Sequence, residues 1–431
     1  DGRGYVVSGL RIDRTADYVG LFGHLGGAVR DIGLADAAVA GGRYTGALAG
    51  VNEGTIANVY ATGAVEGGDD TGGLVGHNLN GTITNAYAAG TVAGGDNTGG
   101  LVGRNSGGEI AETYAMGEVT GAGTRGGLVG MNDGTVARSF YATTDAGGNP
   151  VDNGSGGGNP DGATGKRLDE LRQLSTFTAA GWNISDRGGE DTVWRIYEGG
   201  TTPLLRTFLT SIAVTAADGG SKVYDGNTSA SGTYTQSIGS AVLDGTAVYA
   251  LDDKNAGSRT LNVSGLYSDQ RGYDISFVGG GYTVTPKALT VTGLSAGDKT
   301  YDGTTTATWT GAALSGTVAG DEVALDGRGV TASFADAEVG VGKAVTLQGS
   351  FGLGGADASN YTLTQPTAGL SADIRPAAPQ DPKAAAAITS AQKSWPDMQA
   401  EARPWAVSAN VEHEREFGEV VTVRGSGIRL P

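Results

Sequence analysis

The sequence predicts an all-β protein that opens with a right-handed parallel β-helix of about five coils of 27 residues. Three observations support this fold class. A glycine-rich motif recurs through residues 1–145, Gly makes up 78 of 431 residues while amphipathic helical patterns are scarce, and Val and Thr alternate with polar residues after about residue 208. We therefore expect the β-helix at 1–145, a loop and cap segment at 146–208, two small β-sandwich domains at 209–286 and 287–376, and a linker and tail at 377–431.

The repeat has a nearly constant spacing. The leucines of its Gly-Leu-x-Gly step are separated by 27, 26, 27 and 27 residues: Leu21, Leu48, Leu74, Leu101 and Leu128. An asparagine recurs two residues after the closing glycine, at Asn52, Asn78, Asn105 and Asn132, and an aromatic position recurs at Tyr60, Tyr87, Tyr114 and Tyr141. The first copy is degenerate, with Leu25 in place of the asparagine and Leu34 near the tyrosine position, which is typical of a terminal repeat.

Each repeated position has a physical reason in a stacked coil. Units with one or two leucines do not suit a leucine-rich repeat, whereas three short strands per unit suit a β-helix. Leu, Val, Ile and Tyr are expected to point inward and stack on their own copies. Asparagine amides can form a ladder that satisfies the backbone at a buried corner, and glycines allow positive φ and close contact between coils. Such a repeat builds length and stiffness rather than a pocket.

The motif GGLVGHNLNGTITNAYAAGTV and its copies resemble the GLUG repeat of large bacterial surface and secreted proteins, over about residues 46–145. This resemblance implies a surface-exposed repeat and by itself implies no activity.

After the repeat, residues 145–165 form a loop rich in Gly, Asn and Pro. The sequence KRLDELRQLSTF then predicts a short helix with three leucines on one face: Leu168, Leu171 and Leu174. Four apolar residues should cover the open end of the solenoid and shield its strand edges: Trp182, Trp194, Ile196 and Leu204. Their pattern resembles the segment that commonly closes GLUG arrays.

Two copies of a second unit follow, 77 residues apart. Each contains the turn motif Lys-x-Tyr-Asp-Gly, at Tyr224-Asp225-Gly226 and Tyr301-Asp302-Gly303. Both resemble the YDG domain, a small β-sandwich of bacterial filamentous adhesins, over about 210–376. The first copy is shorter and lacks the Gly-Asp-x-Val of residues 320–323, so we expect its sheet edge to be incomplete or paired differently. The motif could be a ligand site, but Asp-Gly favours a turn against which the tyrosine packs.

The tail at 377–431 combines an Ala/Pro-rich linker, a short helix broken at Pro396 and a strand, GEVVTVRG. GLUG and YDG units together resemble the C-terminal half of a two-partner-secretion exoprotein. This implies an outer-membrane transporter of the two-partner type, or another cell-surface protein, as partner of the tail. The chain has no Cys, which excludes a Cys-closed anchoring hook.

Charge and composition limit the other partners. The formal charge of −17 argues against nucleic acid as a partner, because an acidic chain repels the phosphate backbone. No apolar run reaches the 18 residues of a transmembrane helix. The sequence starts at Asp1 without a signal peptide, so we expect it to be a piece of a longer precursor.

Few residues suggest chemistry. Asp69, Asp70 and Asp96 lie in equivalent turns, where a stacked carboxylate row could hold Ca²⁺ or act in a lyase, although solvated turn residues are favoured. His24 and His77 share a variable, outward position with Val51, Arg104 and Met131, and about 10 Å between them is too far for one zinc ion. His413 lies in a charged run. We predict no catalytic, metal or cofactor site.

A threonine row, Thr55, Thr82 and Thr135, is interrupted by Glu109. Such rows can bind ice or glycans, and weak contact with glycans or exopolysaccharide is favoured here. The sequence therefore predicts a secreted bacterial adhesin or stalk at the cell surface, associated with the outer membrane, that is not an enzyme. A polysaccharide-binding or polysaccharide-degrading β-helix and a self-assembling filament subunit are the alternatives.

Overall fold

The computed structural model describes residues 1–151, 161–367 and 369–377. The described residues fall into two compact units, unit 1 over 1–286 and unit 2 from 287 to the end of the described residues at 377. Regular structure in the described residues is β-strand apart from α1 (Leu174–Thr178) and the 3₁₀ turns η1 (Glu170–Arg172), η2 (Arg206–Phe208) and η3 (Ala358–Asn360). The all-β prediction is confirmed. The expected tail helix around Pro396, the strand GEVVTVRG and His413 lie outside the described residues.

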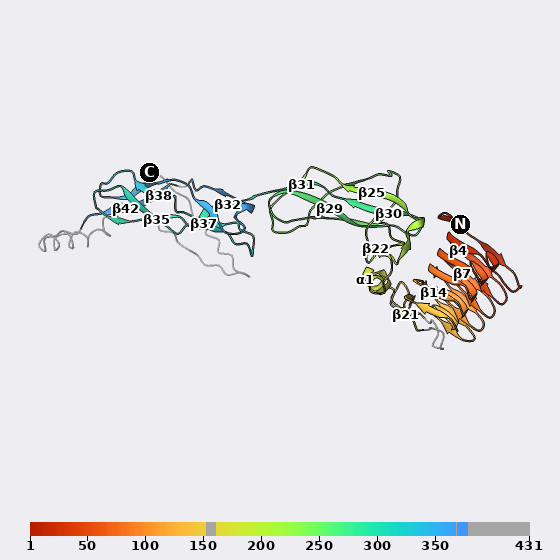
Figure 1. The fold of residues 1–431 in the computed structure, drawn as a ribbon. Coiled ribbons are helices and arrows are strands. Elements are labelled where there is room, and N and C mark those ends of the chain that lie inside the picture. The colour runs from red at the N-terminus through yellow and green to blue at the C-terminus, as the bar shows by residue number, and fades with distance from the viewer. Residues whose placement is uncertain (152–160, 368, 378–431) are drawn as a thin grey trace, which may run out of the picture. The chain divides into compact units, whose positions relative to one another are not determined.

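Unit 1 begins with a parallel β-solenoid of about six turns (Figure 1). Its longest sheet follows the order β1 (Tyr5–Ser8), β4 (Ala28–Ala40), β7 (Thr55–Glu66), β10 (Thr82–Ala89), β15 (Tyr114–Met116), β20 (Ser139–Ala142) and β21 (Ala163–Lys166). Further strands of this sheet pair beside that path: β2 (Arg11–Asp13), β11 (Val92–Gly94), β14 (Glu109–Ala111), β16 (Val119–Gly121) and β19 (Thr135–Ala137).

Two narrower sheets complete each turn. One consists of two-residue strands: β5 (Thr45–Gly46), β8 (Thr71–Gly72), β12 (Thr98–Gly99) and β17 (Arg125–Gly126). The other carries the V-G-x-N step of the repeat: β3 (Phe22–Leu25), β6 (Ala49–Asn52), β9 (Val75–Leu79), β13 (Val102–Ser106) and β18 (Val129–Asn132).

The solenoid has strands on either side of the five aligned repeats: the first two lie within the predicted bounds of 1–145, and the last lies beyond them. At the start, β1 and β2 pair in parallel with β4, and at the other end β21 pairs in parallel with β20. These strands lack the Gly-Leu-x-Gly step. Strand pairing uses backbone groups, which every sequence offers, so the motif alone could not mark these added strands.

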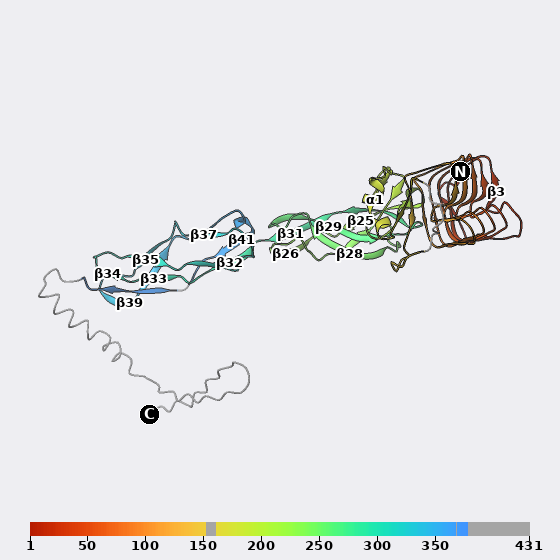
Figure 2. The ribbon, with the colours of Figure 1, turned by 90° about the horizontal axis from the view of Figure 1, so that it is seen from below.

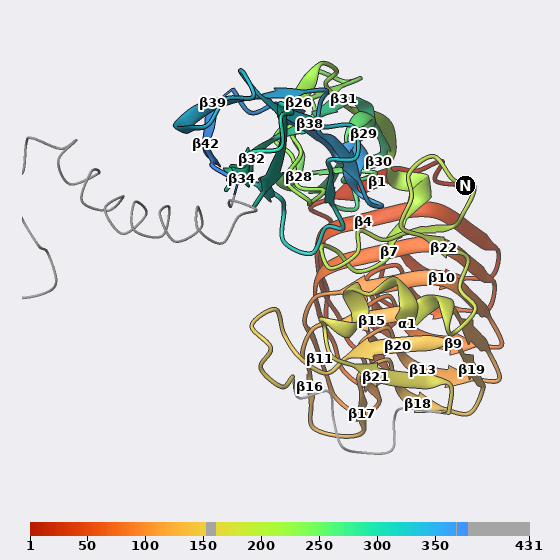
Figure 3. The ribbon, with the colours of Figure 1, turned by 90° about the vertical axis from the view of Figure 1, so that its left-hand side faces the viewer.

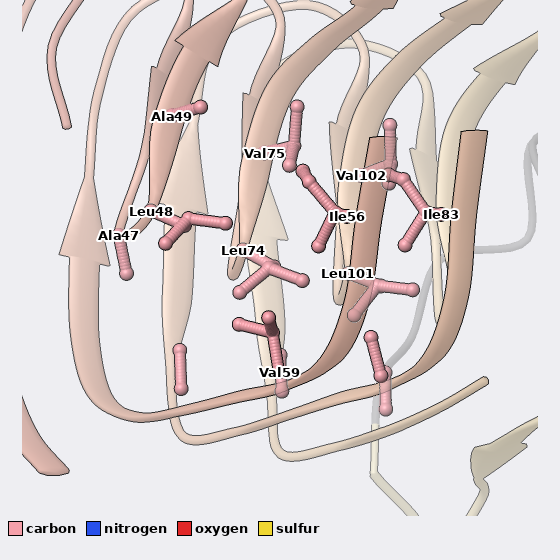
Figure 4. Close-up of a cluster of buried hydrophobic side chains, with 14 of the residues drawn as sticks. Ala47, Leu48, Ala49, Ile56, Val59, Leu74, Val75, Ile83, Leu101 and Val102 are labelled. Atoms are coloured by element: carbon pink, nitrogen blue, oxygen red, sulfur yellow. The ribbon is translucent and has the colours of Figure 1, made fainter. Parts of the chain in front are cut away.

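Successive turns pair in register, so each repeated residue stacks on its own copy. Val75 pairs with Val102, Ile83 with Ile110, and Asn78 with Asn105. Four of the five repeat leucines and the isoleucines of the long sheet fill the interior (Figure 4), and these are fully buried: Leu48, Leu74, Leu101, Leu128, Ile56, Ile83 and Ile110. Leu21, in the degenerate first copy, is half-buried against them. For Leu, Val and Ile the inward prediction is confirmed.

The closing glycine of Gly-Leu-x-Gly lies against the backbone of the preceding turn. A Cβ on Gly76 would come within 2.6 Å of Tyr44 C, and one on Gly103 within 2.5 Å of Asp70 C. Any side chain there would push two turns apart. Close contact, rather than positive φ, therefore explains this glycine.

The rest of unit 1 is a segment that we call the cover (residues 161–208) and the first small β domain. The cover begins with β21, which pairs with the solenoid, and beyond its helical turns it holds β22 (Ile184–Ser185), β23 (Trp194–Arg195) and β24 (Leu204–Leu205). The domain has two sheets. Their strands are β27 (Tyr234–Gln236), β25 (Thr210–Ala216) and β30 (Tyr273–Val278) in one, and β26 (Gly220–Val223), β31 (Gly280–Thr285), β29 (Gly257–Tyr267) and β28 (Asp244–Leu251) in the other.

Unit 2 repeats this plan with more strands. A six-stranded sheet contains β33 (Ser295–Gly297), β35 (Thr306–Thr310), β38 (Thr331–Phe334), β39 (Gly340–Gln348), β42 (Leu370–Arg375) and β34 (Lys299–Thr300). Two smaller sheets contain β36 (Ala313–Ser315), β32 (Lys287–Thr292) and β41 (Tyr361–Thr364), and β37 (Ala324–Asp326) and β40 (Gly352–Gly354). The six-stranded sheet and β32, β37 and β41 lie toward opposite ends of the unit (Figure 2).

The two small domains differ at one sheet edge. In unit 2, β35 pairs with β38. In the first domain only the isolated bridge between Ser229 and Ala250 forms at the corresponding place, and β28 ends the sheet. The first copy reads SASGT where the second reads TATWT, so small residues replace strand formers. The expected incomplete edge is present.

Candidate functional site

A buried ladder of amides runs along one corner of the solenoid. Asn52 Nδ2 donates to Asn78 Oδ1 at 2.7 Å, and the same bond joins Asn78 to Asn105 and Asn105 to Asn132 at 2.8 Å. Each of the two central amides also donates to the carbonyl three residues on, at Gly81 and Gly108. Asparagine suits this position because it is both donor and acceptor, so identical copies satisfy one another.

A second ladder consists of aromatic rings on the long sheet. Tyr60, Tyr87 and Tyr114 stack with centroids 5.2 and 4.8 Å apart and planes within 9°. These rings face outward, away from the interior cluster, which corrects the expectation that they point inward. In β10 the inward positions are Ile83, Ala86 and Ala88, and alternation along the strand places Tyr87 on the other face.

The fourth ring of the ladder is Phe140, not Tyr141. Tyr114 pairs with Phe140, and Tyr141 pairs with Ala115. The last unit has lost one residue in its turn, because Asn132 is followed by Asp-Gly-Thr where Asn105 is followed by Ser-Gly-Gly-Glu. A fixed spacing of 27 therefore points one residue too far, and Tyr141 instead packs against the interior cluster.

The cover buries this aromatic ladder along the side of the solenoid (Figure 3). The ring centroids of Trp194 and Tyr114 are 5.9 Å apart, as are those of Trp182 and Phe140. Phe208 and Tyr60 form an edge-to-face pair with centroids 4.9 Å apart. The sequence-based placement over the open end was wrong, because outward rings need a lateral partner to leave water.

Polar bonds fix the cover in place. Trp194 Nε1 donates to Asn85 Oδ1 at 3.0 Å, Trp182 Nε1 donates to the Arg138 carbonyl at 2.8 Å, and the Tyr114 hydroxyl donates to the Pro203 carbonyl at 2.6 Å. Burial holds the pKa of the Tyr114 hydroxyl above its ordinary value, so it stays a donor. The indole and phenol groups thus keep hydrogen bonds while their rings are buried.

The other apolar residues of the cover do not all pack on the aromatic ladder. Leu171 and Ile196 are fully buried in the aromatic cluster, and Leu204 is buried outside it. The predicted helix is split into η1 and the short α1, with Leu174 at the start of α1 and Leu168 before η1.

A buried ionic cluster joins the cover to the first small β domain. Asp274 of β30 is 3% exposed and lies 3.2 Å from Arg195 Nε and 2.5 Å from Arg206 Nη1. The guanidinium of Arg195 also lies over the Tyr197 ring, 4.0 Å from its centroid. Burial lowers the pKa of Arg195. Removing one partner would leave an uncompensated buried charge, so this contact fixes the domain to the cover. Nothing in the sequence pattern marked it.

The acidic turns do not form a carboxylate row. Asp69 and Asp96 are exposed, as expected for turn residues, but Asp70 is fully buried, which corrects its assignment as solvated. Asp70 Oδ2 accepts from Arg43 Nε and Nη2 at 3.2 Å, and its other oxygen accepts from Asn97 Nδ2 at 2.8 Å. Within residues 1–151, 161–367 and 369–377, no group of three His, Cys, Asp or Glu is placed to hold a metal ion.

The two histidines of the variable position have separate partners. His24 Nε2 lies 3.5 Å from Glu53 Oε1 and is exposed. His77 is half-buried, which lowers its pKa, and its Nε2 lies 3.1 Å from Ser106 Oγ. The threonine row is in register as expected: Thr82 pairs with Thr55 and with Glu109, and Glu109 with Thr135.

Both Tyr-Asp-Gly motifs are turns built around a lysine. Lys299 Nζ donates to Asp302 Oδ1, the Thr304 carbonyl and the Thr306 carbonyl at 2.7, 2.7 and 3.0 Å. Lys222 binds Asp225, Asn227 and Ser229 in the same way. Gly226 and Gly303 adopt φ of 81° and 75°, which a turn with glycine allows. In each motif the lysine ammonium holds the turn together by donating to the aspartate and to backbone carbonyls of the turn.

The tyrosines of these turns differ. Tyr224 is 1% exposed, in keeping with an anchoring role, whereas Tyr301 is 42% exposed. The expectation that both tyrosines pack against their domains is therefore wrong for the second copy.

Comparison with known proteins agrees with these repeats. A family model of the GLUG motif matches residues 67–93, and a model of the YDG domain matches residues 285–368. The chain carries a GLUG motif and a YDG domain. Halomucin of Haloquadratum walsbyi is 47% identical over 79 residues, which is 18% of this chain and 1% of halomucin. No solved structure matches the chain. In the described residues, no helix is long and apolar enough to cross a membrane.

We predict that Asn78→Ala lowers the free energy of unfolding by about 3 kcal/mol, because two buried ladder partners lose their bonds. Thermal and urea unfolding followed by circular dichroism would measure this. Asn132→Ala is the matched control: Asn132 is half-buried at the end of the ladder, so water replaces its bond and the loss should be about 1 kcal/mol. Equal losses of unfolding free energy in the two variants would contradict the role assigned to the buried ladder bonds.

We predict that Trp194→Ala destabilises the cover by about 3–5 kcal/mol, because its ring contacts and its bond to Asn85 are lost. Limited proteolysis of the full chain should then cut within residues 161–208. Trp309→Ala, which removes a ring packed on Phe351 in unit 2, should leave the cover resistant. A protected cover in Trp194→Ala would contradict the role assigned to this ring.

We predict a pH-dependent contribution from the second Tyr-Asp-Gly turn. The bond from Lys299, with those from Thr304, lowers the pKa of Asp302 to about 2. A lowered folded-state pKa stabilises the turn above the unfolded value of about 4, and this is lost as pH falls toward 2. Carboxyl NMR titration should show the low pKa, and Lys299→Met should raise it. Lys222→Met, in the other turn, should leave Asp302 unchanged.

Proposed function

We propose that the chain is a non-catalytic part of a secreted bacterial cell-surface adhesin, acting as a stiff stalk that carries attachment surfaces. The observation that carries this proposal is the presence of a GLUG motif and a YDG domain in one chain. The likeness to halomucin, by its name a mucin, supports an extracellular setting.

The contacts of unit 1 support a mechanical role. Ladders of backbone, amide and ring contacts run from turn to turn, the cover spans the side of the solenoid, and the Asp274 cluster ties the cover to the next domain. Each junction is buried, so relative motion of these parts would expose apolar rings or unpaired charge. Such a unit would transmit force without a hinge between solenoid and domain.

The geometry gives less support to a polysaccharide-degrading enzyme. Such chemistry needs two carboxylates facing one sugar linkage. Of the three candidate carboxylates in the turns, only Asp70 is buried, and it is hydrogen-bonded to Arg43 and Asn97. The other two, Asp69 and Asp96, are exposed turn residues. Binding to glycans at the cell surface or in a matrix is the activity that we assign to the adhesin.

We further propose that residues 377–431 hold the chain at the cell surface, through an outer-membrane transporter of the two-partner type or another surface protein. This assignment rests on the resemblance of the GLUG and YDG combination to exoproteins and on the strand-like sequence GEVVTVRG.

We predict that deleting residues 377–431 moves the chain from the cell surface to the medium, since the stalk would lose its anchor. Immunoblots of cell and medium fractions of the producing bacterium would measure this, together with attachment of the cells to a coated surface. A chain whose tail is replaced by a Gly/Ser linker of equal length is the control for length alone, and should also be released. Undiminished retention of the deleted chain would refute the anchor, and release of reducing sugar ends from polysaccharide would refute the non-catalytic role.

A further inference from the structure

One corner of the solenoid departs from the residue types that its backbone favours. In four successive turns the residue at this corner has a left-handed conformation: φ is 62° at Tyr18, 60° at Tyr44, 56° at Asp70 and 59° at Asn97. The last three precede β5, β8 and β12, and Tyr18 precedes Val19, which bridges to Thr45 of β5. Asp and Asn tolerate this region, whereas other L-residues are disfavoured in it by about 1–2 kcal/mol. Two successive turns therefore hold an aromatic residue where later turns hold Asp and Asn.

Packing against the interior does not account for these two tyrosines. Tyr18 is 51% exposed, and neither residue belongs to the interior cluster. The rings instead stack on each other at the surface, with centroids 5.0 Å apart, and Tyr44 stacks on His77 at 5.5 Å. Strained backbone combined with a surface stack of one exposed and one half-buried ring is more typical of a binding surface than of a structural contact.

A fixed guanidinium lies beside this stack. Arg43 Cζ is 4.5 Å from the centroid of the Tyr44 ring, and Asp70, fully buried, holds Arg43 through Nε and Nη2. The Arg43 side chain is 47% exposed, and its Nη1 lies outside the bonds to Asp70. Asp70 is itself held by Asn97 Nδ2, so the guanidinium is oriented before any ligand arrives.

Polar groups of both signs surround the rings. His77 Nε2 meets Ser106 Oγ, which also accepts from Arg104 Nε at 3.0 Å, and Asp17 accepts from the backbone N–H of Arg43. Arg43 is balanced by Asp70, so the corner carries no strong positive field, and the chain as a whole is at −17. A polyanion is therefore poorly matched.

We propose that the corner formed by Tyr18, Tyr44, His77 and Arg43 binds a neutral saccharide. The C–H face of a pyranose ring packs against an aromatic ring, and its hydroxyls are both donors and acceptors that match a guanidinium, an imidazole and a serine hydroxyl. The inference rests on the proposed adhesin function and deepens it, because it assigns the attachment chemistry to one place on the solenoid.

The test replaces both tyrosines by the residue that the same corner carries at position 97. The double variant Tyr18→Asn and Tyr44→Asn removes the rings and relieves the left-handed strain. Saccharide affinity should fall about tenfold or more, whereas the unfolding temperature should stay equal or rise. The full chain would be titrated with four- to six-unit oligomers of glucose, mannose, galactose and N-acetylglucosamine, by saturation-transfer NMR and calorimetry.

Two further variants separate binding from folding. Tyr5→Asn removes a tyrosine that is 75% exposed and outside the stack, so affinity should be unchanged. Arg43→Gln keeps the rings and removes the guanidinium that pairs with buried Asp70, so affinity should fall, and circular dichroism of the variant would check that the fold persists without this pair. Three results would overturn the proposal: no binding of any oligomer by the full chain, undiminished binding by the double variant, or a lower unfolding temperature of the double variant together with full binding by Arg43→Gln.

Attachment of cells that display the chain distinguishes this inference from the adhesin function itself. If cells with the double variant attach to saccharide-coated surfaces as well as cells with the original chain, the corner site is refuted and the adhesin function stands. If cells with the original chain do not attach to any coated surface, the adhesin function is refuted as well.

Discussion

In-register pairing of each solenoid turn with the next is the constraint on which the rest of unit 1 depends. Because the strands are parallel and the pairing offset is 26 or 27 residues, every side chain lies beside its own copy. A repeated position can be buried only if identical side chains of successive turns pack on or hydrogen-bond to one another. Asparagine amides satisfy one another, flat rings stack and branched aliphatic chains interdigitate, whereas a buried row of like charges would repel. The one buried carboxylate of the turn row, Asp70, accordingly stands between Arg43 and Asn97.

This constraint also explains why the long sheet needs a partner. Its outer face carries a row of rings in the positions of Tyr60, Tyr87, Tyr114 and Phe140, which in isolation would expose a continuous apolar stripe. The cover removes that stripe from water and then presents Arg195, Arg206 and Tyr197 to the next domain. Each layer thus creates the surface that the following layer buries, from the solenoid to the cover and from the cover to the first small β domain.

Periodicity made the solenoid predictable, and its limits follow from the same cause. Spacing identified the interior leucines, the amide ladder and the tyrosine positions, because each recurs with its own copy. Spacing does not say which face of the strand a ring occupies, so Tyr87 was predicted to face the interior although it lies on the outer face. A single deletion in the last turn moved the ladder from Tyr141 to Phe140.

Contacts between segments that are not repeats of each other leave no periodic pattern, so they could not be predicted from the sequence. The bond from Trp194 to Asn85 and the Asp274 cluster each join residues far apart in the chain. The lysine at the centre of each Tyr-Asp-Gly turn was visible as a residue type in the motif, yet its enclosure by backbone carbonyls depends on the folded turn. The GLUG and YDG resemblances supplied the domain types, while the lateral position of the cover required the structure.

The lateral position of the cover has a consequence for how unit 1 comes apart. A bare stack of repeats is a one-dimensional array, in which a terminal turn can fray while its neighbours persist. Rings on the cover touch rings on four successive turns, from Phe208 on Tyr60 to Trp182 on Phe140. No one of these turns can leave without disturbing a segment that the others also hold. The cover therefore converts a row of separable turns into a single cooperative body, which melts or resists as one.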